Sequence, residues 1–212
     1  MKIKYLIVLF SPLIFSNSES IEVDLCEKLF RNKIVAYSSS YLVDPKFSKD
    51  RYSADKAFDE KDETAWVAGG KNDGIDEFLV FQIIVVIEDS FPKSTYLEIK
   101  NGLYKSSSLY FANNRIKRAE LEIYECDAGI RGMYWTVFQK PILNTTINID
   151  FEDKMEVKKI KIDINNKLKS KQEFPIFLFV GKLIVKEIYK GKLYNDTCIS
   201  EINSYAGQDI LD

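Results

Sequence analysis

The sequence contains no histidine, and this absence removes several kinds of functional site at once. Ser-His-Asp and Cys-His catalysis need an imidazole, and so does a zinc site with histidine ligands. The side chain that most often changes its charge near neutral pH is missing as well. An enzyme built on this chain would have to use its carboxylates, which number 32.

Cysteine is also scarce. Cys26, Cys126 and Cys198 form no CxxC pair, so the sequence indicates neither a dithiol redox site nor a cysteine-ligated zinc. Because the number is odd, at least one thiol is left out of any intramolecular disulfide. Two interpretations are open: a Cys26–Cys198 disulfide if the two ends of the chain meet, or burial of the cysteines as small apolar side chains.

The chain has no block of like charge, and its formal net charge is −2. A nucleic-acid partner would leave a basic patch, so none is predicted. No internal repeat, low-complexity tract or linker divides the 212 residues, of which 46% are apolar. These features indicate one globular domain. Aromatic residues reach 13%, which suits a β-rich fold and supplies rings that can stack on sugars.

The first 18 residues are predicted to be a secretory signal peptide. Lys2 and Lys4 precede an apolar run over residues 5–15, and Ser16 and Ser18 supply a cleavage signal of small residues. The run is shorter than the roughly 20 residues that span a bilayer. A lipoprotein would need Cys26 directly after the cut. We therefore expect a chain in which residues 19–212 form one domain, secreted or located in the periplasm or at the cell surface, with no catalytic domain attached.

From Ile34 onwards, apolar and polar residues mostly alternate, which is typical of half-buried β-strands. The pattern is clear at residues 119–124, 147–151 and 160–164, while residues 79–87 and 177–188 are longer apolar runs. No helix longer than two turns is predicted, although residues 22–33 are compatible with one short helix. The sequence therefore predicts an all-β, antiparallel β-sandwich.

A polar stretch from Tyr52 to Phe78 precedes the first apolar run and carries acids, glycines and Trp66. Asp59, Asp62 and Thr64 lie within six residues of each other, and hard cations prefer such oxygen ligands. The spacing differs from that of an EF-hand. A solvated acidic turn is therefore the alternative to a calcium site.

Four stretches together resemble the discoidin, or coagulation-factor type C, domains. Residues 57–66 (AFDEKDETAW) are similar to their AxDGxxxTxW signature. Residues 74–78, 101–115 and 189–202 resemble further elements of bacterial discoidin-like modules, including one that is attached to a secreted NAD glycohydrolase and regarded as glycan-binding. The resemblance covers residues 35–202 and implies a galactose-binding-like jelly roll.

The resemblance also implies a structural calcium ion. The matching side chains are those of Asp59, Thr64 and Glu201, and main-chain carbonyls of Lys56, Lys61 and Ser200 would complete the shell. The chain departs from the family at two positions of this loop: Glu60 replaces a Gly and Lys61 an Asp or Asn. A metal-free loop held by hydrogen bonds between the same residues is the alternative.

A second polar and aromatic set is the predicted ligand site. Sugars are bound by rings that stack on C–H faces and by amide or guanidinium groups that contact hydroxyls. A structural role for Trp66, and an ordinary loop and strand edge over residues 105–118, are the alternatives. The predicted ligand-binding residues are Trp66, Asn101, Tyr104, Lys105, Tyr110, Asn113, Asn114 and Arg115.

Three functions therefore compete. The first is a non-catalytic module that binds a glycan or glycosylated surface. The second is adhesin-like binding of a host protein or phospholipid surface, for which Phe91 and residues 109–111 are the candidate apolar loop tips. The third is a carboxylate enzyme built on Asp73, Asp76 and Glu77. We predict the first, because the resemblance favours it and clustered loop acids are usually solvated.

Overall fold

The computed structural model describes residues 25–26, 29, 35–83, 87–88, 91–92, 95–126, 128–131, 134–137, 141–164 and 178–206. The predicted signal peptide lies outside these residues. Within them, no helix is long and apolar enough to span a membrane.

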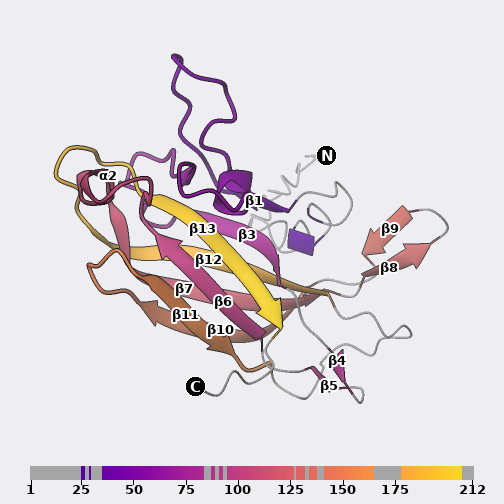
Figure 1. The fold of residues 1–212 in the computed structure, drawn as a ribbon. Helices are drawn as coiled ribbons and strands as arrows, with labels where there is room; N and C mark the ends of the chain where they lie inside the picture. Colours follow the sequence, from indigo (N-terminus) through magenta and orange to yellow (C-terminus); the bar gives the residue numbers. More distant parts are fainter. Residues whose placement is uncertain are drawn as a thin grey trace, which may run out of the picture.

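The two main sheets stack as a sandwich (Figure 1). The larger sheet has the strand order β1-β3-β12-β7-β10, and all its pairings are antiparallel. Its strands are β1 (Ala36–Ser38), β3 (Phe78–Ile83), β12 (Leu178–Tyr189), β7 (Arg115–Cys126) and β10 (Ile142–Asp150). The smaller sheet has the order β11-β6-β13-β2 and is also antiparallel. Its strands are β11 (Val157–Ile162), β6 (Thr95–Asn101), β13 (Cys198–Ala206) and β2 (Trp66–Val67). The all-β antiparallel sandwich is therefore confirmed.

The remaining elements are short. Two small hairpins pair β4 (Ile87–Glu88) with β5 (Phe91–Pro92), and β8 (Ala128–Arg131) with β9 (Tyr134–Val137). The 3-10 helix η1 (Ala54–Ala57) precedes a loop over residues 58–65 that carries several acids. The helix α2 (Ser107–Ala112) was not predicted. It begins where the hydroxyl of Ser106 accepts a hydrogen bond from Leu109 N, as an N-cap does.

The core lies between the sheets and follows from the alternation in the sequence. On β7, Ala119, Leu121 and Ile123 are fully buried, while Glu120 and Glu122 point away from the core. Strand β6 has the same alternation, with every second side chain buried. Facing apolar side chains from both sheets thereby close one continuous core, which supplies the main driving force for folding.

The disulfide of this protein is not the Cys26–Cys198 pair that the sequence left open. Cys26 is bonded to Cys126, with 6.0 Å between their Cα atoms, and Cys198 is a free, buried thiol. Leu25, Cys26 and Leu29 pack on the outer face of the larger sheet, where β7 ends at Cys126. Cys198 lies in a separate cluster beside Ala65 and Val67 on the smaller sheet. Of the two interpretations left open, the Cys26–Cys198 disulfide is ruled out because the segment around Cys26 packs on the other sheet, while Cys198 is a buried thiol as the second one has it.

Candidate functional site

The loop after η1 builds the first candidate site. Residues 58–65, which we call the cation loop, lead from η1 towards β2. Glu60 has φ of 59°, so it adopts the left-handed conformation in which the related domains carry Gly. The Thr64 hydroxyl donates a 2.6 Å hydrogen bond to Asp59 Oδ1 and lies 3.1 Å from the carbonyl of Lys61. Asp59, Lys61 and Thr64 thus converge as a cluster of oxygens.

Glu201 of β13 is the fourth member of this cluster. It is 1% exposed, and no donor meets ordinary hydrogen-bond geometry at either carboxylate oxygen, although the amides of Glu60 and Lys61 lie close enough to act on it. Burial, and to a lesser extent the negative charge of Asp59, raise the pKa of Glu201 to about 7. The nearby amides of Glu60 and Lys61 and the charge of Lys100 act in the opposite direction. A buried carboxylate without a partner is costly, so this position calls for a proton or a cation.

The residues present fit calcium in their chemistry. Asp59 and Glu201 supply carboxylates and Thr64 a hydroxyl, which are the oxygen ligands that Ca²⁺ prefers. In the described ranges, no three Asp, Glu, His or Cys side chains gather around one point, so main-chain carbonyls would have to complete the shell. Lys56, Lys61 and Ser200 are the residues predicted to supply them. Lys56 Nζ lies 4.0 Å from Asp59 Oδ2 and already offsets part of its charge.

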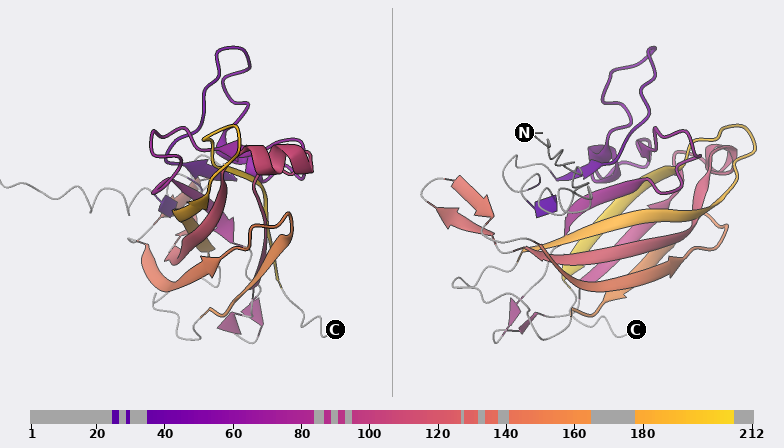
Figure 2. Two further views of the ribbon diagram at one scale, coloured as in Figure 1. Left: turned by 90° about the vertical axis from the view of Figure 1, so that its left-hand side faces the viewer. Right: turned by 180° about the vertical axis from the view of Figure 1, so that it is seen from behind.

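A cleft of about 790 Å³ lies beside this loop. Figures 1 and 2 show two elements that border it, α2 and the loop leading into β13, side by side at one end of the sandwich. Its lining combines aromatic rings, leucines, and side chains of both charges. The lining residues are Leu42, Asp44, Ser48, Arg51, Tyr52, Lys56, Glu63, Thr64, Ala65, Leu103, Lys105, Leu109, Asn113, Tyr194 and Asp196.

Arg51 is held in place on one wall of the cleft. Its guanidinium carbon lies 4.1 Å from the centre of the Phe47 ring and 5.5 Å from that of Tyr52. No carboxylate pairs with this guanidinium among the residues that the structure describes, and the same is true of the Lys105 ammonium group. Stacking on two rings orients the planar group while leaving its donors free. Both cations are therefore available to donate hydrogen bonds to a ligand oxygen.

Two of the eight predicted ligand residues line the cleft. Lys105 is exposed there, whereas Asn113 is largely buried, and its side-chain amide donates to Leu109 O at 2.8 Å. Tyr104 is half-buried and faces elsewhere, because its hydroxyl donates to the carbonyl of Glu156 at 2.5 Å.

The other five predicted residues are buried: Trp66, Asn101, Tyr110, Asn114 and Arg115. Trp66 donates to Ser40 O at 3.0 Å, and Tyr110 donates to Lys154 O at 2.5 Å. Such side chains cannot touch a ligand without a rearrangement. In this structure each of them donates a hydrogen bond to a main-chain carbonyl, which favours a structural role over the predicted direct contact with a ligand.

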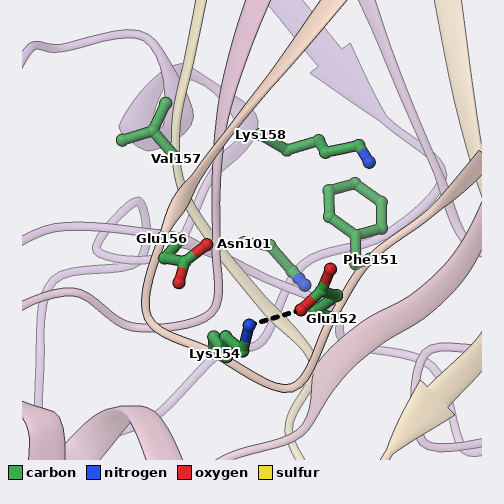
Figure 3. A pocket seen from close by; sticks show the side chains of 7 residues that line it. All are labelled: Asn101, Phe151, Glu152, Lys154, Glu156, Val157 and Lys158. Atoms are coloured by element: carbon green, nitrogen blue, oxygen red, sulfur yellow. Dashed lines mark ion pairs between the residues drawn. The ribbon is translucent and has the colours of Figure 1, made fainter.

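Several of these side chains hold one turn, residues 151–156. Tyr104 and Tyr110 donate to its carbonyls, and Arg115 Nε donates to Asp153 Oδ1 at 3.1 Å. Figure 3 shows the pocket of about 130 Å³ beside the turn, with Glu152 and Lys154 paired across it at 2.6 Å. It is small and four of its seven lining residues are charged side chains, two of which pair with each other, so we do not assign a ligand to it.

Two of the three acids considered for an enzyme, Asp73 and Glu77, are tied into the scaffold, while Asp76 is exposed. Glu77 Oε2 accepts a 2.7 Å hydrogen bond from Ser40 and a further one from Ser39. Asp73 forms an ion pair with Lys190, and the hydroxyl of Thr197 donates to the carbonyl of Asp73. These contacts give both residues structural partners.

The cleft residues that sequence reasoning missed lie on two loops. Leu42, Asp44, Ser48, Arg51 and Tyr52 come from the loop between β1 and η1. Tyr194 and Asp196 come from the loop before β13. The signal available for the first loop was the adjacent pair Arg51 and Tyr52, a guanidinium and an aromatic ring shortly before the 57–66 motif.

Comparison with known proteins identifies the family. The model of the NAD glycohydrolase translocation F5/8 type C domain matches residues 30–205. Among the curated proteins, none matches this chain.

Solved structures offer likenesses of fold alone. The arabinofuranosyltransferase AftD from Mycobacteria is 13% identical over 84% of this chain, with a TM-score of 0.48, and this chain spans only 11% of that protein. CBM32-1 from a family 31 glycoside hydrolase of Clostridium perfringens is 20% identical, over 80% of this chain and 93% of that one, with a TM-score of 0.39. The Streptococcus pyogenes NAD+-glycohydrolase translocation domain is 19% identical, over 68% and 93%, with a TM-score of 0.33. Because the family model covers most of its length, the chain belongs to the NAD glycohydrolase translocation F5/8 type C domain family.

Proposed function

We propose that this protein is a secreted, non-catalytic module that binds carbohydrate in the cleft at the loop end of the sandwich. The observation that carries the proposal is the lining of the cleft. Tyr52 and Tyr194 offer rings, while Arg51, Lys105 and Asp196 offer hydrogen-bonding groups. Rings that stack on C–H faces, beside a few placed polar groups, are the usual means of binding a sugar. Family membership supports an exported surface-binding module.

Calcium belongs to the proposal as a structural ion. Asp59, Thr64 and Glu201 would hold it through their side chains, with carbonyls of Lys56, Lys61 and Ser200. When bound, the ion would link the cation loop to β13 and neutralise the buried carboxylate of Glu201 and the half-buried one of Asp59. It supplies no reaction chemistry here. Because Lys56 and Thr64 also line the cleft, an ordered cation loop gives the cleft one firm wall.

A glycan array tests the function. The purified protein is screened with calcium and with EDTA, together with Arg51→Ala and Lys105→Ala as cleft variants. Lys161→Ala, an exposed lysine on β11, is the matched control. We expect selective binding that both cleft variants lose and the control keeps. A well-folded protein that binds no glycan, or cleft variants that bind like the wild type, would contradict the proposal.

Exposed apolar side chains near the mouth of the cleft favour a second candidate, binding of a protein or phospholipid surface. Val43 is 54% exposed and Phe47 46% exposed, both on the loop that carries Arg51. The loop tips proposed from sequence fit less well, because Tyr110 is buried and Leu109 and Phe111 are half-buried. The side chain of Phe91 lies outside the described part of the chain.

Liposome sedimentation distinguishes this candidate from the first. Binding to vesicles of phosphatidylcholine and phosphatidylserine that Phe47→Ser abolishes, together with a blank glycan array, would favour the surface-binding alternative. Glycan binding without vesicle binding would support the carbohydrate proposal and argue against the surface-binding alternative.

A further inference from the structure

The segment 190–196, which joins β12 to β13, has its main chain fixed at nearly every residue. Lys192 N donates to Phe111 O at 3.0 Å, and the amides of Leu193 and Tyr194 donate to Ala112 O at 3.0 and 2.9 Å. These bonds satisfy carbonyls at the end of α2, which a helix end leaves without intrahelical partners. The segment is therefore docked on α2 by its own amides.

Asn114 holds the same segment from beneath. It is fully buried, and its side-chain Nδ2 donates to Asn195 O at 2.8 Å. Its Oδ1 accepts from Gly191 N at 2.7 Å, and its main-chain N donates to Asp196 O at 2.9 Å. One side chain thus bridges both ends of the segment. The guanidinium of Arg115 adds a 3.2 Å bond to the carbonyl of Lys190.

The fit at Gly191 shows how closely the segment is packed. A Cβ atom built there would lie 2.4 Å from Ala112 O and 2.6 Å from Tyr194 O. Both neighbours are main-chain atoms, so they cannot move aside cheaply. Only Gly allows this approach between the segment and the end of α2.

This fixed main chain carries unusually exposed side chains. Leu193 is 76% exposed, the highest value among the large hydrophobic residues of the described part, and Tyr194 is 49% exposed while lining the cleft. Most loops that expose such side chains can move to cover them. A loop that is held rigid while presenting them has the properties of a preorganised binding surface, because ordering then costs little when a ligand binds.

We propose that segment 190–196 is a preordered recognition element in which Tyr194 contacts the ligand and Asn114 is the positioning residue. The inference rests on the proposed carbohydrate function and assigns a specificity-determining residue to it. The Tyr194 ring stacks on the C–H face of a sugar, and the Asp196 carboxylate in the same wall accepts a hydrogen bond from a hydroxyl. Leu193 broadens the apolar edge of this contact.

The test combines hydrogen exchange with binding. Exchange measured by mass spectrometry compares the wild type with Asn114→Ala and Gly191→Ala. Binding uses lactose, N-acetyllactosamine and 3′-sialyllactose immobilised on a chip, with Tyr194→Ala, Tyr194→Phe and Leu193→Ser added. Val157→Ala, an exposed apolar residue on β11, is the matched control.

We expect peptides covering 190–196 to exchange at least about tenfold faster in Asn114→Ala, while peptides from β7 and β12 keep the wild-type rate. Global destabilisation would speed all of them. Tyr194→Ala should weaken binding by roughly tenfold or more, which corresponds to about 1.4 kcal/mol. Tyr194→Phe should bind as well as the wild type because it keeps the aromatic ring. Val157→Ala should also bind like the wild type.

Two results would overturn the inference. One is unchanged exchange of 190–196 in both Asn114→Ala and Gly191→Ala. The other is wild-type binding by Tyr194→Ala when the wild type binds a probe, which would leave the carbohydrate function intact. If the wild type binds no probe, the proposed function fails and the role of Tyr194 falls with it, while exchange still decides whether Asn114 orders the segment. Should Asn114→Ala not fold, the surface variant Tyr194→Ala still decides the recognition role.

Discussion

The buried carboxylate of Glu201 on β13 lies near the half-buried carboxylate of Asp59 in the cation loop. Burial raises the pKa of Glu201 to about 7, and the neighbouring charge of Asp59 acts in the same direction. Repulsion between the two carboxylates destabilises the folded protein, and a proton or a cation bound there would remove this repulsion. Two predictions follow from this relationship, one for each way of relieving it.

Without metal, the stability of the protein should fall as pH rises. The pKa of Glu201 is about 7 in the folded protein and 4.5 as a model value, so the folded state binds more protons between these two pH values. The free energy of unfolding therefore decreases from about pH 4.5 to about pH 7, by on the order of 3 kcal/mol from this group.

Urea denaturation in EDTA at pH 5 and pH 8 measures this change. Glu201→Gln is neutral at both pH values, so it should remove most of the difference and be more stable than the wild type at pH 8. The prediction fails if the variant and the wild type show the same pH dependence.

Calcium should stabilise the wild type at pH 8. An ion that binds only the folded state adds about 2.7 kcal/mol at a concentration 100 times its Kd. Asp59→Asn should lose this gain in a calorimetric melting experiment. Asp62→Asn is the matched control, because Asp62 is exposed in the same loop and pairs with Lys100 at 2.6 Å. An equal response of both variants to calcium would argue against the site.

Glu60→Gly should stabilise the protein by up to about 1 kcal/mol. Glu60 has φ of 59°, a conformation that costs an ordinary residue roughly 1–2 kcal/mol and Gly almost nothing, although Gly loses more chain entropy on folding. Glu63→Gly, at a position in the same loop without a positive φ, should destabilise instead. Chemical denaturation of both variants checks the sign, and a loss of stability in Glu60→Gly would refute the argument.

Asn101→Ala should destabilise the protein by about 2–4 kcal/mol. The Asn101 amide donates to Ile116 O at 2.7 Å and accepts from Ile116 N at 2.8 Å, so its removal leaves two buried main-chain groups without partners. Tyr104→Phe removes one hydrogen bond at a half-buried position and should cost only about 1 kcal/mol. Equilibrium urea unfolding compares them, and equal effects would contradict the structural role given to Asn101.

Much of the fold could be predicted because alternation is a local property. The pattern around Leu121 and Ile149 records directly which face of a strand meets the core. The helix α2 escaped prediction because six residues carry too little periodicity, and its signal was the cap at Ser106. The partner of Cys26 could not be found from sequence, because it depends on which sheet face the segment packs against, 100 residues away.

The cleft was predicted less well, for a related reason. Loops at residues 42–56, 103–113 and 194–196 meet only after the sandwich has formed. The type of a polar residue also does not reveal whether its side chain points into the cleft or into the protein. Lys105 faces the cleft, whereas Asn114 and Arg115, close by in sequence, turn inward to bond main-chain groups.

The Cys26–Cys126 disulfide and the cleft lie at opposite ends of the sandwich. Strand β7 begins at Arg115, beside the cleft, and runs 12 residues to Cys126, a span of about 36–40 Å at the usual rise of a strand. The covalent tether of the Cys26 segment is therefore at the end of the sandwich remote from the cleft. The covalent constraint of the disulfide therefore acts on the end of the larger sheet that lies away from the cleft.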